Sequence, residues 1–194
     1  MDELIQYLHA VHPMGPDLEA HLRSKLRLHV FPRGSHLLRI GELSQTILFI
    51  TKGLVRSYHI YRREEVSNWF MKEGDVCISI LSFLRRWPSV DSIVALEDCE
   101  CWGITYEELE ETYRLYPTFN IHGRLIANEY YCRSEERQQA IRRQTPEDKY
   151  ARLMEKDTAL VRRVQNNHLA SFLNVGDRTF NLIRKAFKER KGRK

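Results

Sequence analysis

The sequence NNHLASFLNVGDRTFNLIRKAFKERKGRK, residues 166–194, contains two helical patterns joined by a tight turn. The first begins at Asn166 or Asn167, a residue type that caps helix starts well. The chain then turns at residues 174–176, Asn-Val-Gly, where Asn tolerates a left-handed backbone and Gly adopts it freely. The second pattern places Phe180, Ile183 and Phe187 on one face of a helix. We therefore expect two short helices that pack against each other.

The opposite face of the second helix is polar and mostly basic. A helix-turn-helix needs this division, because its second helix buries one stripe on the first and presents another to the major groove. A plain helical hairpin with a solvated basic face gives the same pattern, so both interpretations stay open at this point. The candidate DNA-binding residues are Arg178, Thr179, Asn181, Arg184, Lys185 and Lys188.

Charge is divided unevenly along the 194 residues. Residues 142–194 carry 15 Lys and Arg against 6 Asp and Glu, whereas residues 1–141 carry 16 against 20. A basic carboxy-terminal module on an acidic body favours binding to the phosphates of double-stranded DNA. RNA and an anionic membrane would also attract a basic tail.

Composition indicates a globular protein, since 42% of the residues are hydrophobic. No apolar run approaches the roughly 18 to 20 residues of a membrane span, and the acidic start differs from a secretion signal. We expect a cytoplasmic protein with no membrane partner. The sequence has no Cys-x-x-Cys motif and its cysteines are expected to be reduced and structural; they are Cys77, Cys99, Cys101 and Cys132.

Secondary-structure patterns change along the chain. Residues 2–25 predict amphipathic helices broken at Pro13 to Pro16, and residues 26–104 predict short strands with glycines at the bends. Alternation is clearest over Leu54 to Tyr61 and Val66 to Met71, which a polar hairpin turn over residues 62–65 separates. Regularly spaced short strands are typical of a sandwich or jelly roll. A short helix is expected over Tyr106 to Tyr116, followed by a long one over residues 118–144.

The next boundary lies at Thr145-Pro146, where Thr caps a helix and Pro suits its first turn. The predicted fold class is α+β, with a β jelly roll, a long connecting helix and an all-α helix-turn-helix domain. We expect three domains: residues 1–117 with the amino-terminal helices and the jelly roll, residues 118–144 with the dimerisation helix, and residues 145–194 with the DNA-binding module.

This order of parts resembles the Crp/Fnr family of bacterial transcription factors, which includes the cyclic-AMP receptor protein and the fumarate-nitrate regulator. The resemblance runs from about residue 20 onward. The stretches that carry it are Phe31-Pro-Arg-Gly34, Ile50-Thr-Lys-Gly53-Leu-Val-Arg, Glu73-Gly74-Asp75, Ala95-Leu96 and Leu169-Ala-Ser-Phe-Leu173 with the helix that follows.

The resemblance implies a regulator that is not an enzyme. It implies a homodimer joined along the long helix, at Ile121, Leu125 and Cys132, with two recognition helices in successive major grooves, and RNA polymerase as a further partner. It also implies an effector pocket in the jelly roll, with the residues Gly74, Asp75, Ile78, Ser79, Ser82, Ser89 and Val90.

Two segments depart from the family pattern. Ile78-Ser79 stands where cyclic-nucleotide binders place a Gly-Glu pair, and Ser89-Val90 stands where they place an Arg-Ser pair. Loss of that arginine removes the strongest partner of a cyclic phosphate. Arg85 and Arg86 are candidates to replace it, but their place in a loop beside Trp87-Pro88 favours solvated side chains. We therefore expect no cofactor, and an unidentified small-molecule effector or none, with cyclic AMP disfavoured. The amino-terminal iron-sulfur cysteines of the fumarate-nitrate branch are missing, because the first cysteine is Cys77.

The recognition helix departs as well. Asp177, Arg178, Thr179 and Leu182 occupy the positions of the family's Arg-Glu-Thr and following Arg, so the operator should differ. Arg178 suits bidentate contact with guanine and Thr179 suits a phosphate contact.

Two other classes of protein share some of these features. A jelly-roll metalloenzyme needs clustered ligands, but His29, His36 and His59 stand alone in the strand region, so neither a metal nor a catalytic residue is expected. The alternative that stays open is a ligand-binding module whose helical end joins a protein partner instead of DNA.

Overall fold

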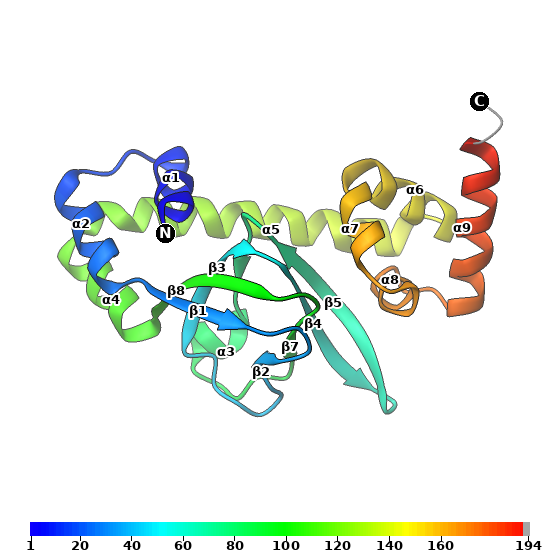
Figure 1. The fold of residues 1–194 in the computed structure, drawn as a ribbon, viewed down its shortest axis with the longest axis horizontal. Helices are drawn as coiled ribbons and strands as arrows, with labels where there is room; N and C mark the ends of the chain where they lie inside the picture. Colours follow the sequence, from blue (N-terminus) through cyan, green and yellow to red (C-terminus); the bar gives the residue numbers. More distant parts are fainter. Residues whose placement is uncertain (192–194) are drawn as a thin grey trace. The chain divides into compact units, whose positions relative to one another are not determined.

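The computed structural model describes residues 1–191 and divides into two compact units (Figure 1). Unit 1 comprises Met1–His59 and Trp69–Glu129. Unit 2 comprises Ile60–Asn68 and the chain from Tyr130 onward. The predicted boundaries after residues 117 and 144 divide the chain by role and stay predictions.

Unit 1 is built on two four-stranded sheets that face each other, apart from the hairpin segment Ile60–Asn68, which belongs to unit 2. The strand orders are β1-β8-β3-β6 and β2-β7-β4-β5. The first sheet contains β1 (Arg27–Phe31), β8 (Cys99–Thr105), β3 (Thr46–Lys52) and β6 (Val76–Cys77), and the second contains β2 (His36–Leu38), β7 (Ser92–Ala95), β4 (Leu54–Tyr61) and β5 (Glu64–Lys72). This antiparallel arrangement confirms the predicted jelly roll.

The core of unit 1 lies between these sheets, where Ile50, Val55 and Ile93 are buried together with three cysteines. All four cysteines are free thiols, and only Cys132 is exposed. Burial raises the pKa of the Cys77 thiol, and that of Cys101 to about 12, so both stay protonated and pack as small apolar groups.

Turns follow the expected chemistry, with one correction. The glycines at the bends, Gly34, Gly41, Gly53 and Gly74, all have positive φ. Between β4 and β5 the sequence predicts a four-residue turn over residues 62–65, but the structure turns at two residues. Arg62 and Arg63 have φ of 50° and 69°, the left-handed pair that a two-residue hairpin turn requires, so β5 already begins at Glu64.

Helices cover one end of unit 1 (Figure 1). Tyr7 of the first helix packs on β3, with ring centroids 5.1 Å from Phe49, and Lys25 of the second pairs with Glu111 at 2.8 Å. Thr105 and Glu108 form a capping box at the start of the fourth. These helices are α1 (Asp2–Val11), α2 (Pro16–Lys25), α4 (Tyr106–Leu115) and the short η1 (Pro117–Phe119) that precedes α5 (Asn120–Arg143).

Unit 2 contains the second half of α5 and four shorter helices. Thr145 accepts a hydrogen bond from the Asp148 amide over 3.2 Å, and Pro146 is the first helical residue, as predicted. Tyr150 packs edge-on against Phe180 and Phe187, and the surrounding core includes Leu169 and Ile183. The four helices are α6 (Pro146–Lys156), α7 (Thr158–Arg163), α8 (Asn166–Phe172) and α9 (Asp177–Lys191).

Within residues 1–191, no helix combines the length and the apolar character needed to cross a membrane.

Candidate functional site

Helix α9 has two different faces. Phe180 and Ile183 are buried and Phe187 is half-buried against α6 and α8. The side chains predicted to contact DNA lie mostly on the other face and are exposed: Arg178, Thr179, Asn181, Lys185 and Lys188. All six candidate residues thus lie on α9 and five of them are exposed, while their role in DNA binding stays a prediction.

The sixth candidate, Arg184, points toward α8. It is half-buried, and its Nη1 donates to Oδ1 of Asn166. Asn166 in turn donates from Nδ2 to Oδ1 of Asn181 over 3.3 Å. Arg184 therefore takes part in packing α9 onto α8.

The connection into α9 differs in two details from the sequence-based expectation. The residue that caps α8 is Gln165, with no side-chain bond to the helix, because Asn166 is already helical and its amide binds α9. At the turn, Asn174 has a left-handed φ of 54°, as expected, but Gly176 does not have a positive φ. The Val175 amide donates to the Ala170 carbonyl over 3.0 Å, so one left-handed residue suffices to reverse the chain.

The region expected to hold an effector contains a helix that the sequence does not predict, α3 (Ile80–Arg85). Six residues are too few to show a helical period. Ser79 and Ser89 are buried and their hydroxyl oxygens lie 3.0 Å apart. Ser82 is buried too, and its Oγ accepts from the Ser44 amide over 2.8 Å. These serines hold the segment in place through their own hydrogen bonds.

The two arginines of this segment have protein partners. Arg86 donates to the Ser44 carbonyl over 3.0 Å and its guanidinium lies 4.4 Å from the Tyr106 ring centroid. Arg85 lies over Trp87 at 5.1 Å. Arg86 is therefore half-buried and bonded rather than solvated, whereas Arg85 is exposed as expected.

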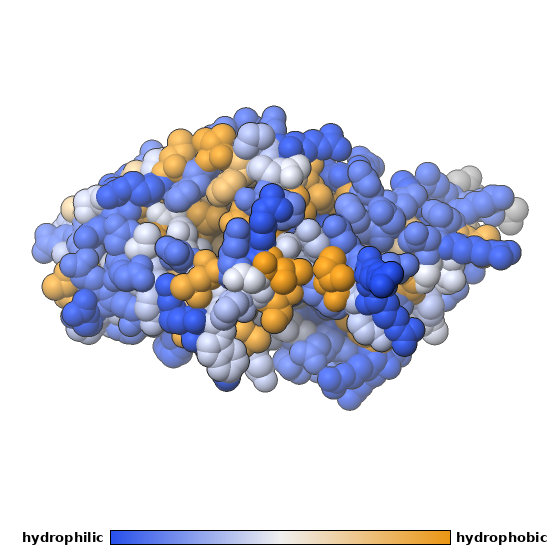
Figure 2. All heavy atoms as spheres, turned by 90° about the horizontal axis from the view of Figure 1, so that it is seen from below, coloured by the Kyte–Doolittle hydropathy of each residue, from blue (hydrophilic) through white to orange (hydrophobic). Residues whose placement is uncertain are grey.

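Other predicted pocket residues are dispersed. Gly74 and Asp75 form the turn between β5 and β6, where the Asp75 carboxylate accepts from the Lys72 amide over 3.0 Å. Val90 is 67% exposed. Several apolar side chains of α3 are exposed as well. The face of the molecule shown in Figure 2 is mainly hydrophilic, with separate apolar patches.

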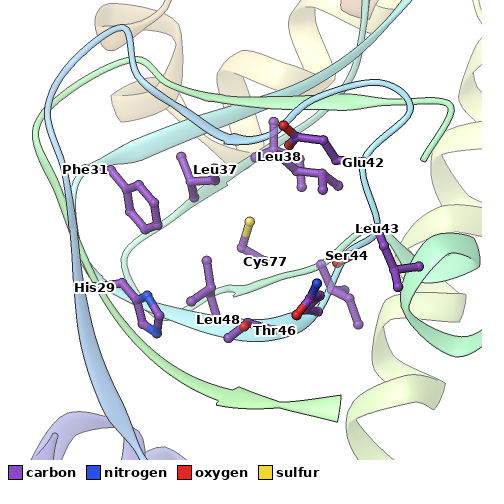
Figure 3. A pocket seen from close by; sticks show the side chains of 13 residues that line it. His29, Phe31, Leu37, Leu38, Glu42, Leu43, Ser44, Thr46, Leu48 and Cys77 are labelled. Atoms are coloured by element: carbon purple, nitrogen blue, oxygen red, sulfur yellow. The ribbon is translucent and has the colours of Figure 1, made fainter. Parts of the chain in front are cut away.

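A cavity of about 530 Å³ lies elsewhere in the jelly roll (Figure 3). Its lining comes from β1, β2, β3, β6 and β7 and from the loop between β2 and β3, and includes Phe31, Leu37, Leu48 and Cys77. Ile78 is the one residue it shares with the predicted effector pocket. Alternation predicts which side chains point inward, but the space between them depends on how the strands pack, which no local pattern reveals.

The residues predicted to join two copies of the chain lie on α5. Ile121 and Leu125 are half-buried and Cys132 is exposed. Tyr131 beside Cys132 is 67% exposed. Their role in a dimer stays a prediction. In the described part of the chain, no three His, Cys, Asp or Glu side chains gather as a metal site.

Comparison with known proteins places the fold. Residues 28–116 match the family model described as a cyclic nucleotide-binding domain, and no curated protein matches the chain. The catabolite activator protein of Thermus thermophilus is 19% identical with a TM-score of 0.56, over 93% of this chain and 86% of that one. The c-di-GMP-responsive global regulator CLP of Xanthomonas campestris is 13% identical with a TM-score of 0.72, over 91% and 93%.

FixK2 from Bradyrhizobium japonicum is 14% identical with a TM-score of 0.72, over 86% of both chains. Identities this low establish a common fold and nothing finer. Residues 28–116 therefore resemble a cyclic nucleotide-binding domain, and the likeness in fold to these three regulators extends over nearly the whole chain.

Proposed function

We propose that this protein is a sequence-specific, dimeric, DNA-binding transcription regulator of the Crp/Fnr type, acting in the cytoplasm without catalysing a reaction. The observation that carries the proposal is the division of α9, which buries Phe180 and Ile183 and leaves Arg178, Lys185 and Lys188 exposed. With α8 before it, α9 forms a helix-turn-helix whose second helix is free to enter a major groove.

The exposed residues of α9 differ in what they offer to DNA. Arg178 lies in the first turn, at the end of a recognition helix that contacts base edges, and its fork of donors suits guanine. Thr179 beside it suits a phosphate oxygen. Lys185 and Lys188 follow on the same exposed face and provide positive charge for the backbone, which raises affinity without reading sequence.

Dimerisation through α5 supplies the second recognition helix. The half-buried Leu125 and the exposed Cys132 lie on this 24-residue helix, which is long enough to pair with a second copy. We expect Leu125→Glu to shift the protein from dimer to monomer in light scattering, because it places a charge in the helix pair. Ala127→Glu adds the same charge at a nearby exposed position and should leave the dimer intact.

Regulation by cyclic AMP is disfavoured in this proposal. The position of the phosphate-binding arginine is occupied by Ser89, which is buried and bonded to Ser79, and a cyclic phosphate would lack a charged partner there. We propose instead an effector of a different chemical kind, or none, and RNA polymerase as the partner of the DNA-bound dimer.

The decisive experiment is enrichment of fragmented genomic DNA on the purified protein near physiological salt, with and without cyclic AMP. A two-fold symmetric motif with half-sites about one helical turn apart is the expected result, and it should not depend on the nucleotide. A protein carrying Lys185→Glu and Lys188→Glu is the matched control and should enrich nothing. If the unaltered protein enriches no motif, the alternative of a protein partner for unit 2 replaces the proposal.

A further inference from the structure

The cavity in unit 1 lies between the two sheets of the jelly roll. His29 and Phe31 enter it from β1, Thr46 and Leu48 from β3, and Leu37 from β2 (Figure 3). At about 530 Å³ it falls in the size range of small-molecule sites.

Its lining argues against an anionic occupant. Among the described residues that line it there is no lysine or arginine. Burial raises the pKa of the Cys77 thiol, which stays neutral. Glu42 at the edge is exposed, and one of its carboxylate oxygens accepts from the Arg39 amide over 2.7 Å. A phosphate or carboxylate would therefore lose its hydration without gaining a lysine or arginine as partner.

Five residues of the lining are polar: Glu42, Ser44 and Gln45 belong to the loop between β2 and β3, whereas His29 and Thr46 lie on β1 and β3. The His29 ring is parallel to that of Phe31, with centroids 6.2 Å apart, and the Thr46 side chain lies on the neighbouring part of the wall. Gly103 of β8 lies directly beneath them. A Cβ there would stand 2.7 Å from Thr46 Cγ2, 2.7 Å from Leu48 Cδ2 and 3.0 Å from His29 Nε2. Because Gly103 has no side chain, these three lining residues can pack directly against β8.

We infer that this cavity binds a small, uncharged, largely apolar molecule that carries a hydrogen-bonding group directed toward His29 and Thr46. Such a site has a large apolar wall and a few polar groups that fix orientation, which is the usual composition of small-molecule sites. The ligand class differs from a cyclic nucleotide in charge.

The loop that closes the cavity is bonded to the segment around α3. The Gly41 amide donates to the Ser89 carbonyl over 2.7 Å, and the Ser89 amide donates to the Glu42 carbonyl over 2.8 Å. Ser44 is bonded to Ser82 and Arg86. A ligand that displaces this loop therefore displaces the predicted effector segment too. This regulatory consequence rests on the proposed function, whereas ligand binding itself does not.

The test uses two fluorescent probes that differ by one charged group, with the full chain and no DNA. N-phenyl-1-naphthylamine is uncharged and should bind saturably at one site per chain. The related 8-anilinonaphthalene-1-sulfonate carries a sulfonate and should bind that site at least tenfold more weakly. Equal affinity of the two probes would overturn the inference, as would the absence of saturable binding of the neutral probe.

Three variants assign the site. Leu37→Trp and Leu43→Trp fill the cavity from two different segments and should each weaken the neutral probe at least tenfold. Val30→Trp, at an exposed position between His29 and Phe31, adds the same ring outside the cavity and should stay within twofold. Thermal unfolding identifies a variant that does not fold. In that case the other cavity variant shows whether the neutral probe binds in the cavity. Retained affinity in a folded cavity variant would refute the site. DNA affinity is measured separately, so failure of one proposal does not decide the other.

Discussion

The ring of Tyr150 on α6 stands edge-on to the ring of Phe180 on α9, with centroids 5.5 Å apart and an interplanar angle of 84°. Both residues are almost completely buried, at 2% and 0% exposed. This aromatic contact fixes which face of α9 turns inward, and therefore which side chains remain outside. Edge-to-face pairs contribute beyond the area they bury.

Of the single substitutions on α9, we expect replacement of Phe180 to lower the stability of unit 2 most. We expect Phe180→Ala to lower the free energy of unfolding of this unit by about 3–5 kcal/mol, because a large buried ring is replaced by a cavity. Urea unfolding followed by circular dichroism measures the change. Leu182→Ala, two residues away and 62% exposed, should stay within about 0.5 kcal/mol. Equal effects of the two changes would contradict the packing described for α9.

The exposed residues of α9 should separate into two classes in DNA binding. We expect Arg178→Ala to relax base preference, whereas Lys185→Ala and Lys188→Ala should weaken binding to all sequences about equally. Each lost phosphate contact should reduce the slope of log affinity against log salt by about 0.9. Titrations of specific and random duplexes at several salt concentrations measure both effects.

Lys25→Ala is the matched control for these changes, since Lys25 lies in unit 1 and pairs with Glu111. It removes the same charge and should change neither affinity nor salt dependence. Identical profiles for Arg178→Ala and the two α9 lysine variants would show that the assigned roles are wrong.

Elements with a strong local signal could be predicted from the sequence. The strand Leu54–Tyr61 and the helix start at Pro146 agree with the expectation residue for residue, because alternation and capping act over a few neighbours. Asn174 supplies the predicted left-handed turn for the same reason.

Features that depend on distant segments could not be predicted. Arg184 fits a basic helix face by spacing, but it turns toward Asn166, eighteen residues earlier in the chain. The two-residue strand β6 exists only because Leu48 and Phe49 of β3 pair with it. The cavity depends on the absence of a side chain at Gly103 on another strand. In each case the deciding partner lies outside any local window of sequence.

His122 should make the protein less stable in mild acid. Burial lowers the pKa of His122 below 6.5, an effect that its 2.8 Å hydrogen bond to the His12 carbonyl oxygen only partly offsets. The unfolded chain therefore binds a proton at a pH at which the folded chain does not, and stability falls as the pH drops through 6.5. One group contributes at most about 1.4 kcal/mol per pH unit.

Urea unfolding at pH 7.5 and pH 5.5 measures this loss. His122→Phe removes the titrating ring and keeps an aromatic group beside Phe119, whose ring centroid lies 5.0 Å away. We expect the variant to lose less stability than the parent protein between the two pH values. Parallel profiles would mean that other groups cause the acid sensitivity.

Addition of a single methyl group at Gly103 should disturb the cavity wall. In Gly103→Ala the new Cβ would stand 2.7 Å from side-chain carbons of both Thr46 and Leu48, so these residues must move. We expect a loss of about 1–3 kcal/mol in the free energy of unfolding, the usual cost of an overfilled site. The neutral probe should also bind more weakly, because the displaced side chains line its site.

Gly176→Ala is the control, since a Cβ at Gly176 would have no neighbour within 4 Å, and it should change stability by less than about 0.5 kcal/mol. If Gly103→Ala were as stable as this control, the three lining side chains would not pack as closely against Gly103 as described. The shape of the cavity would then have to be revised.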